Sequence, residues 1–357
     1  MSVVRFGRTD RNVRLTLVGG VLMLMKAACL RGVGGPEVLR YEDVVRPEVG
    51  RGEVLVRTGA VSVNPIDTYV RSGAVKFALP TPWVVGCDVA GTVELVGEGC
   101  DRFRPGDRVW GSNQGLFGRQ GTFAEYCAID EQWLYPLPEV VSFETAAAGA
   151  LVGITAHLGL FLHAGLKAGE VLFVAGGTGG VGSAVVQLAK AAGAIVITTA
   201  GSAEKADLCR QLGADHVIEY RTEDVDHRLQ EITKLTGPIQ VWFETLRTPS
   251  LERCIPLMAM RGRIILMAGR DARPVFPVGP FYVKDLRAIG FAMFNASAGE
   301  QREAAEELNR FLSSGRWRPL IGARMTLDQA AEAHRLQEAN TLHSAGTLTG
   351  KIVLRPL

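Results

Sequence analysis

The stretch Phe173-Val174-Ala175-Gly176-Gly177-Thr178-Gly179-Gly180-Val181-Gly182-Ser183 places five glycines within seven positions. It follows residues 171–175, which are apolar at every position, as expected of a strand buried on both faces. A helical pattern then runs to Lys190 and stops at Gly193. Residues 177–182 have the spacing G-x-G-x-x-G, which is weak evidence alone but specific when it joins a buried strand to a helix.

Each glycine of this loop has an expected role. Gly177 allows a tight turn, Gly179 lets the backbone approach a pyrophosphate, and Gly182 lets the helix pack closely on the strand. The first N–H groups of the helix attract phosphates. The loop therefore predicts a dinucleotide site whose contacts are Thr178, Gly179, Gly180, Val181 and Gly182.

The end of the second strand indicates which dinucleotide binds. An NAD site usually has Asp or Glu there, about 20 residues past the loop, but residues 198–202 (TTAGS) contain no carboxylate. Gly201 and Ser202 leave room for a 2′-phosphate, and Lys205 can supply positive charge to it. Tyr220, which ends the third strand, is a further donor. The pattern favours NADP(H) and leaves NAD(H) open.

The order of predicted strands and helices along the chain indicates two domains. From Glu170 strands and helices alternate, which indicates a parallel sheet with helices on both faces. From Met25 to about Ala150 short strands are broken by Gly and Pro, which indicates a mainly β domain. The elements after Asn295 do not continue the alternation and are expected to return to the first domain. The predicted boundaries are an extension at 1–24, the β domain at 25–150 and 295–357, and the nucleotide domain at 151–294.

Composition excludes several classes of protein. The 357 residues carry a net charge of +2, so no broad basic surface for nucleic acid is expected. Six cysteines without a CxxC pair indicate thiols in a reducing, cytoplasmic compartment and argue against a structural zinc site. Apart from the N-terminus, no segment is apolar enough to suggest a membrane span.

The N-terminal residues allow two interpretations. Basic residues precede an apolar run at 15–25, as in a secretory signal. Lys26 ends that run, and residues 26–30 fit the first strand of the folded domain. We therefore favour an extension upstream of a functional start at Met25.

Several segments together resemble a known family. They are 64–73 (NPIDTYVRSG), 86–91 (GCDVAG), 105–109 (PGDRV), the glycine loop, and 349–354 (TGKIVL). From Met25 to Leu354 the chain resembles the medium-chain dehydrogenase/reductase superfamily, specifically its zinc-independent, zeta-crystallin-like quinone oxidoreductases. The resemblance implies an α/β fold in which a Rossmann doubly wound parallel sheet is inserted in a mainly β, GroES-like catalytic domain.

The chain differs from zinc-dependent members of the superfamily at the zinc-ligand positions, and this difference bears on the reaction that is expected. Where those enzymes hold zinc, this chain looks to have Asn64, Cys87 and Leu151. The motif of their second ligand looks like Gly86-Cys87-Asp88 here, and one thiol and one carboxylate without a histidine or a second thiolate make a poor zinc site, so no metal is expected. Without a Lewis acid to polarise an alcohol, the expected reaction is hydride transfer from NADPH to a quinone or an activated alkene.

The resemblance also implies residue roles. Asn64 and Tyr69 are expected to be catalytic by orienting the nicotinamide or the acceptor. The expected further cofactor contacts are Gly201, Ser202 and Tyr220 at the adenosine ribose, Leu246, Met267, Ala268, Gly269 and Arg270 at the nicotinamide, and Lys351 of the closing motif. Residues 291–294 (FAMF) resemble a late strand beside the segment that pairs between subunits, which implies a homodimer.

Two other functions stay open beside an NADPH:quinone oxidoreductase. The first is an NADPH-dependent alkene reductase acting on an enone or an enoyl thioester, which differs in the pocket formed by residues 110–123. Arg119 is the feature of that loop that would suit a thioester's phosphorylated tail. The second is a non-enzymatic NADPH-binding or RNA-binding protein. The lack of a basic stripe with stacking aromatic residues argues against nucleic acid as the main partner.

Overall fold

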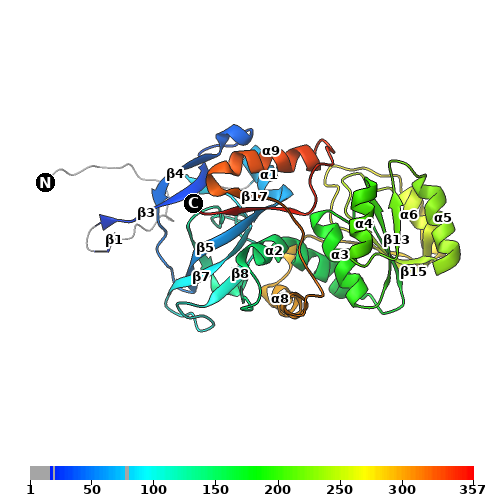
Figure 1. Ribbon diagram of the computed structural model, residues 1–357, viewed down its shortest axis with the longest axis horizontal. Coiled ribbons are helices and arrows are strands. Elements are labelled where there is room, and N and C mark those ends of the chain that lie inside the picture. Colours follow the sequence, from blue (N-terminus) through cyan, green and yellow to red (C-terminus); the bar gives the residue numbers. More distant parts are fainter. Residues whose placement is uncertain (1–16, 19–20, 77–79) are drawn as a thin grey trace. The chain divides into compact units, whose positions relative to one another are not determined.

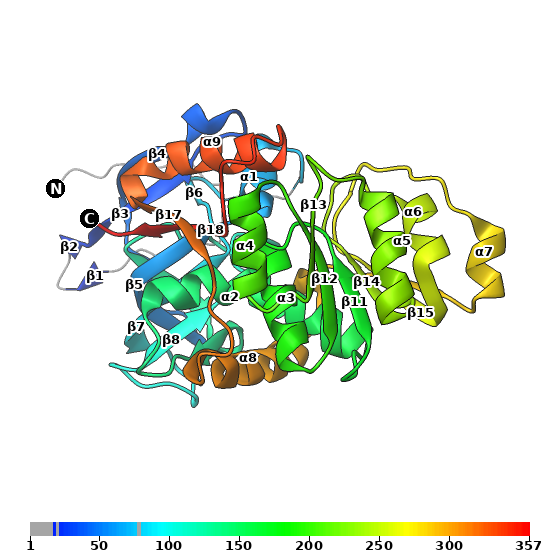
Figure 2. The same cartoon turned by 45° about the vertical axis from the view of Figure 1, so that its right-hand side comes forward.

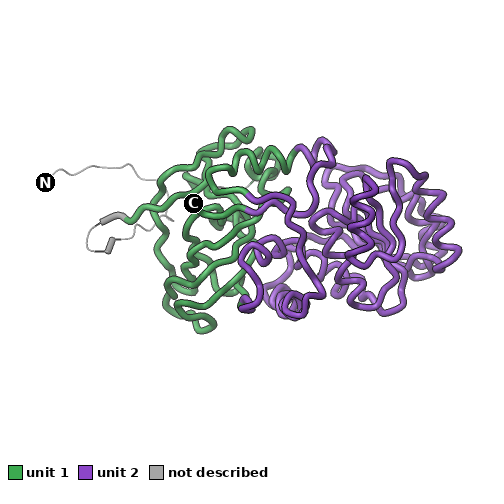
Figure 3. The backbone as a smooth tube through the Cα atoms, in the orientation of Figure 1, with its two compact units in different colours: residues 1–136, 325–338, 354–357 green, residues 137–324, 339–353 purple. Residues whose placement is uncertain are grey.

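The computed structural model describes residues 17–18, 21–76 and 80–357, and the chain separates into two compact units (Figure 3). Unit 1 comprises residues 1–136, 325–338 and 354–357, and unit 2 comprises residues 137–324 and 339–353. The predicted domain boundaries at 25–150, 151–294 and 295–357 stay predictions. The predicted extension, residues 1–24, lies mostly outside the described residues.

Unit 1 is built mainly from antiparallel strands. A small sheet has the order β4-β3-β6, and a larger one runs β10-β8-β7-β5 with β9 also paired to β5. The strands are β1 (Leu17–Val18), β2 (Val21–Leu22), β3 (Leu24–Leu30), β4 (Arg40–Val45), β5 (Glu53–Val63), β6 (Trp83–Val84), β7 (Asp88–Val96), β8 (Arg108–Gly111), β9 (Tyr126–Asp130) and β10 (Leu134–Pro136). Short 3-10 turns occur at η1 (Pro36–Val38) and η2 (Glu131–Trp133).

Strand β5 leads directly into the helix that carries the predicted catalytic residues. Helix α1 (Pro65–Ser72) begins after Asn64, which caps it in extended conformation, and Pro65 occupies its first turn. Gly73 ends the helix in left-handed conformation, with a φ of 77°. The 64–73 motif is therefore a strand end followed by a helix with signals at both termini.

Unit 2 contains a six-stranded sheet in the order β13-β12-β11-β14-β15-β16, and every adjacent pair is parallel (Figures 1 and 2). This is the strand order 3-2-1-4-5-6 of a doubly wound sheet. The strands are β11 (Val171–Val174), β12 (Ile195–Ala200), β13 (His216–Glu219), β14 (Ile239–Glu244), β15 (Met258–Leu266) and β16 (Arg287–Gly290). The predicted α/β fold with a Rossmann sheet is confirmed.

The helices between these strands complete the alternation. They are α3 (Gly180–Ala191), α4 (Ala203–Gln211), α5 (Val225–Thr236), α6 (Leu251–Leu257) and α7 (Val278–Val283). The later elements are η4 (Met293–Asn295), α8 (Ala298–Ser313), β17 (Ile321–Thr326), η5 (Leu327–Gln329), α9 (Ala330–Thr341) and β18 (Lys351–Arg355). The boundary between the two units crosses β17, α9 and β18.

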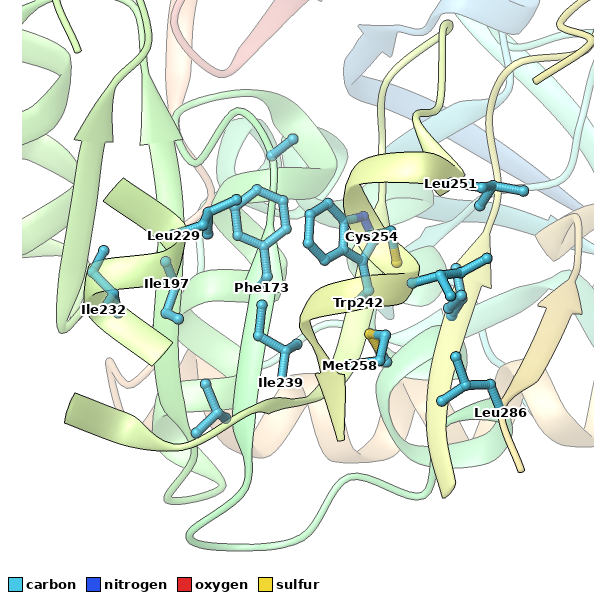
Figure 4. Packing of buried hydrophobic residues seen from close by; sticks show 14 of the residues in the cluster. Phe173, Ile197, Leu229, Ile232, Ile239, Trp242, Leu251, Cys254, Met258 and Leu286 are labelled. Carbon is cyan, nitrogen blue, oxygen red and sulfur yellow. The ribbon is translucent and has the colours of Figure 1, made fainter. Parts of the chain in front are cut away.

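One face of the sheet is closed by α5 and α6. Phe173 of β11 and Trp242 of β14 lie side by side there, with ring centroids 4.1 Å apart (Figure 4). Leu229 of α5 and Cys254 of α6 belong to the same buried cluster. Burial of such aromatic and aliphatic surface stabilises the sheet and fixes where its strands end.

Helix α2 (Phe143–His157) is strongly apolar. Together with the π-helical turn η3 (Leu158–His163) it contains an 18-residue window with a mean hydropathy of 1.7, enough by length and composition to cross a membrane. It is the one such stretch among the described residues, and 83% of that window is buried. Trp317 packs on it, because a Cβ at Gly153 would lie 2.3 Å from the Trp317 ring. The burial is that of a core helix.

One predicted strand is wrong. Residues 291–294 do not form a strand, since the edge strand β16 ends at Gly290 and the 3-10 turn η4 begins at Met293. The Phe291 ring instead packs 4.6 Å from the ring of His163, and Met293 is buried at the start of η4. The contact of Phe291 with His163 and the burial of Met293 therefore take the place of strand pairing at these residues.

Candidate functional site

The predicted cofactor residues of unit 2 come together at one edge of the sheet. Strands β11, β12, β14 and β15 are parallel, so the segments that follow them lie at the same edge. The loops also touch one another. Gly177 N donates to Thr199 O at 3.0 Å, and Thr245 Oγ1 donates to Ala175 O at 2.9 Å.

The glycine loop has the geometry of a phosphate cradle. A Cβ at Gly182 would lie 2.2 Å from Gly176 O, so only glycine lets α3 begin this close to β11. At Gly179, which is exposed, a Cβ would meet a single described atom within 4 Å, Gly176 O at 3.3 Å. Gly179 caps α3 without a side-chain hydrogen bond, so the first N–H groups of the helix remain available to an anion.

The tight turn is made one residue earlier than predicted. Gly176 has the left-handed backbone, with a φ of 66°. Gly177 is needed for a different reason: its Cβ would lie 2.5 Å from Thr198 Oγ1 and 2.8 Å from Cys209 Sγ. The close packing expected at Gly182 is seen in the local geometry, whereas Gly177 serves packing on β12 and α4. The approach of a pyrophosphate to Gly179 stays a prediction.

Gly201, Ser202 and Tyr220 meet after β12 and β13. A Cβ at Gly201 would lie 2.6 Å from the Tyr220 hydroxyl, so the tyrosine lies over the glycine. Ser202 caps α4 and accepts a hydrogen bond from Lys205 N at 3.3 Å. Tyr220 is 48% exposed, which leaves its ring accessible to a ligand.

Two cations lie beside this group. Lys205 Nζ donates to Gly346 O at 2.7 Å and to Leu348 O at 3.2 Å. A Cβ at Gly346 would lie 3.0 Å from an Nη atom of Arg221. Burial lowers the pKa of Lys205, and the like charge of Arg221 lowers it further. Neither cation pairs with a carboxylate in the part of the chain that the structure describes, so an anion would relieve their repulsion.

The loops after β14 and β15 carry the residues expected at the nicotinamide. Glu244 is buried and accepts from Leu246 N at 2.8 Å and from Trp242 Nε1 at 3.2 Å. Burial raises the pKa of Glu244. Its carboxyl group therefore holds Leu246, whose side chain is 44% exposed.

The remaining cofactor candidates border the same edge. Gly269 has a φ of 83°, and a Cβ there would lie 3.1 Å from Arg247 O, so the loop with Met267, Ala268, Gly269 and Arg270 touches the loop after β14. Gly350 N donates to Thr178 O at 2.8 Å, which brings the closing motif to the glycine loop. The buried Lys351 side chain passes 3.1 Å from where a Cβ at Gly180 would lie.

In unit 1 the predicted catalytic Asn64 belongs to a buried hydrogen-bond cluster. Asp88 Oδ2 accepts from Asn64 Nδ2 at 2.8 Å and from Ser62 Oγ at 2.7 Å, and Asp88 Oδ1 accepts from Ser112 Oγ at 2.7 Å. Asn64 and Asp88 are both fully buried. Because the carboxylate can only accept, it fixes which end of the Asn64 amide donates.

Tyr69 lies on α1, five residues beyond Asn64, and is partly exposed. Its carbonyl oxygen accepts from Val75 N at 3.1 Å and from Ser72 Oγ at 3.2 Å. These bonds hold the last turn of the helix. The catalytic roles of Asn64 and Tyr69 stay predictions.

At the positions where zinc-dependent enzymes of the superfamily have zinc ligands, the side chains of this chain make other contacts. Asn64 donates to Asp88, Cys87 is buried, and Leu151 is a buried hydrocarbon in α2. Among residues 17–18, 21–76 and 80–357, no cluster of three or more His, Cys, Asp or Glu side chains could hold a metal ion.

Sequence reasoning missed three residues. Arg221 directly follows Tyr220 at the end of a strand, and that adjacency was a usable signal. Glu244 ends an apolar strand, which also marks it. Asp88 was considered only as a zinc-ligand position, and nothing in the sequence indicated that it binds Asn64.

Comparison with known proteins gives matches along most of the chain. Residues 50–139 match the alcohol dehydrogenase GroES-like domain, and residues 180–314 match the family described as zinc-binding dehydrogenase. Human quinone oxidoreductase is 33% identical over 332 residues, covering 93% of this chain and 98% of that protein. The chloroplastic NADPH-dependent alkenal/one oxidoreductase of Arabidopsis thaliana is 30% identical over 352 residues, covering 97% and 83%.

A solved structure agrees with these matches. Escherichia coli quinone oxidoreductase complexed with NADPH superposes with a TM-score of 0.79 at 28% identity, covering 93% of this chain and 100% of that one. A GroES-like domain combined with a Rossmann sheet of this order defines a medium-chain dehydrogenase/reductase. The chain belongs to the zinc-independent quinone oxidoreductase family of that superfamily.

Two alanine substitutions test separately the phosphate-binding role of Gly179 and the packing role of Gly182. Gly179→Ala has an allowed φ of −72°, and its methyl group would meet one described atom, Gly176 O at 3.3 Å, which must shift by only a few tenths of an ångström. We therefore expect a nearly normal melting temperature and NADPH binding weakened about tenfold or more. Gly182→Ala should lower the melting temperature by several degrees, because its methyl group meets Gly176 O. Fluorescence titration with NADPH and thermal melts measure both effects. Normal NADPH affinity in Gly179→Ala would contradict the assignment of the loop.

Proposed function

We propose that the protein is a cytoplasmic, metal-free NADPH:quinone oxidoreductase. The cradle at Gly179 carries this proposal, because it presents the start of α3 at the sheet edge where the other cofactor candidates meet. The similarity to the human quinone oxidoreductase supports a quinone as the acceptor. The six thiols, all within the described ranges, support a reducing compartment.

The pair Lys205 and Arg221 supports NADPH over NADH. Both cations lie beside Gly201 and Tyr220, where the adenosine ribose of a bound dinucleotide is expected, and a 2′-phosphate would neutralise them. The solved NADPH complex of the Escherichia coli enzyme is a further argument for this cofactor.

Asn64 and Tyr69 are proposed to act on the acceptor. When bound, NADPH would supply a hydride, which is one proton together with an electron pair. Solvent would supply the second proton that completes the hydroquinone. Tyr69 contributes a hydrogen bond that orients the acceptor and stabilises its developing oxyanion. Asn64, whose Nδ2 donates to Asp88 Oδ2 and to Ser62 O, acts by orienting its neighbours and not by donating to that oxygen. Asp88 keeps the Asn64 amide in one orientation, so this side chain is held in place before the acceptor binds.

A second candidate function is reduction of an activated alkene. The 30% identity to the plant alkenal/one oxidoreductase favours it, and the same hydride transfer would serve an enone. An NADPH-binding protein without enzymatic activity is the remaining alternative.

The sheet edge supports a homodimer. Strand β16 ends the sheet with one described neighbour, and apolar side chains stand exposed near it: Met260 (62%), Val278 (62%), Tyr282 (67%) and Val283 (63%). An uncovered edge beside apolar surface invites pairing with a second copy.

The preference for NADPH over NADH tests the proposed role of Lys205 and Arg221 at the 2′-phosphate. Lys205→Met and Arg221→Met should each raise the KM for NADPH about tenfold and leave that for NADH within about twofold, because only NADPH carries the 2′-phosphate. Lys234→Met, at an exposed lysine of α5, is the control. An unchanged preference in both variants would remove these residues from the site.

Acceptor turnover tests the reaction. NADPH oxidation should occur with an ortho-quinone or a para-quinone, faster than with a simple enone, and a chelator should not change the rate. Tyr69→Phe should lower turnover by about tenfold without a matching fall in melting temperature, because it removes one hydrogen bond to the acceptor. Faster turnover of the enone would establish the alkene reductase instead. NADPH binding without any turnover would favour the non-enzymatic alternative.

Sedimentation velocity at micromolar concentration tests the dimer. Val283→Glu should yield monomers by placing charge in the proposed interface. Val140→Glu, at a still more exposed valine remote in sequence, should remain dimeric. A monomeric wild-type protein would contradict the proposal.

A further inference from the structure

Arg119 of unit 1 is a half-buried arginine held in a fixed position. It lies in the loop between β8 and β9, where its Nε donates to Asn113 O at 2.9 Å and its Nη2 to Asn113 Oδ1 at 3.1 Å. Its guanidinium carbon is 5.3 Å from the centroid of the Trp133 ring and 5.5 Å from that of Phe117. The two bonds and the two rings orient the guanidinium plane.

The positive charge of Arg119 is not neutralised by a neighbour. Within the described ranges, no carboxylate forms an ion pair with it. The acid that acts on it from a distance is Asp130, whose oxygens accept from Gln132 N at 3.0 Å and Gln132 Nε2 at 2.8 Å. Burial lowers the pKa of Arg119. A partly buried cation without a counter-ion is costly, which indicates that its partner is a ligand.

A neighbouring donor also lacks an acceptor. Asn113 is 1% exposed and has a φ of 68°, a left-handed backbone that is uncommon outside glycine. Because Asn113 Oδ1 accepts from Arg119, the other end of the amide must be the donor, and this Nδ2 has no hydrogen-bond partner. The guanidinium keeps three N–H groups beyond its two bonds to Asn113. Arginine and amide donors together call for an oxygen-rich anion.

The Arg119 loop is tied to the cluster that holds Asn64. Ser112 Oγ and Asn64 Nδ2 both donate to the Asp88 carboxylate, and Thr122 Oγ1 donates to Asp88 O at 2.8 Å. Gln114 N donates to Cys87 O at 3.3 Å, and Arg119 is close enough to Cys87 for an electrostatic interaction. The unpaired donors therefore belong to the same part of unit 1 as the predicted catalytic amide.

We propose that Arg119, with Asn113, binds a carboxylate or a comparable anionic oxygen group on the hydride acceptor. Arg119 is then a specificity-determining residue, and the preferred acceptors are quinones that carry an acidic substituent. This inference rests on the proposed function, because it assigns the substrate class of that site.

A matched pair of acceptors tests this inference. One is a 1,4-benzoquinone whose side chain ends in a carboxylate, and the other is its methyl ester, which has the same ring but no charge. In the wild-type protein the carboxylate should have the lower KM. Arg119→Met should raise the KM for the carboxylate about tenfold or more, with kcat unchanged, and leave the KM for the ester within about twofold. Arg119→Lys keeps the charge and should recover part of the preference.

The controls distinguish recognition from loop stability. Arg104→Met removes an exposed arginine of the same unit and should change neither KM. Equal losses with acid and ester in Arg119→Met, accompanied by a lower melting temperature, would show that Arg119 only stabilises the loop and would overturn the proposal. Unchanged kinetics with both acceptors would overturn it as well.

A binding measurement separates this inference from the proposed function. If neither quinone is reduced, the proposed function fails, and binding of the two quinones is followed by quenching of tryptophan fluorescence, to which Trp133 beside Arg119 contributes. Tighter binding of the acid than the ester in the wild type, lost in Arg119→Met, would still support the anion site. Equal affinities in the wild type would overturn it.

Discussion

The nucleotide-binding unit depends on the close approach of Gly182 to Gly176. A side chain at Gly182 would stand 2.2 Å from the Gly176 carbonyl oxygen, so helix α3 can start against the end of β11 only with glycine at this position. That contact turns the free N–H groups of α3 toward the carboxyl edge of the sheet. Because the neighbouring strands are parallel, their loops meet at the same edge, and the cofactor candidates become neighbours.

Unit 1 is organised around a different constraint, the buried carboxylate of Asp88. A buried charge must be hydrogen-bonded, and Ser62, Asn64 and Ser112 provide these bonds. One carboxylate thereby links the end of β5, the start of α1 and the loop that follows β8. In this chain, the region that resembles a zinc site is a network of neutral donors around one acid.

The fold could be predicted because its signals are local. The apolar strand at 171–175, the glycines at 177–182 and the caps at Asn64 and Ser202 all act within a few residues. The strand expected at 291–294 was wrong because the packing of Phe291 on His163 and the burial of Met293 depend on distant partners. The same holds for Asp88, whose role comes from contacts with residues about 24 positions away in the sequence. Tertiary contacts of this kind have no local signature.

The apolar helix α2 has a consequence for how the chain is made. Synthesis proceeds from the N-terminus, so residues 143–163 leave the ribosome well before Trp317, which covers Gly149 and Gly153 in the finished protein. During that interval the nascent chain carries a helix as apolar as a membrane span, with its covering side chain not yet made. Chaperones that shield exposed apolar segments therefore have a defined target in this chain, from the completion of α2 until Trp317 has emerged.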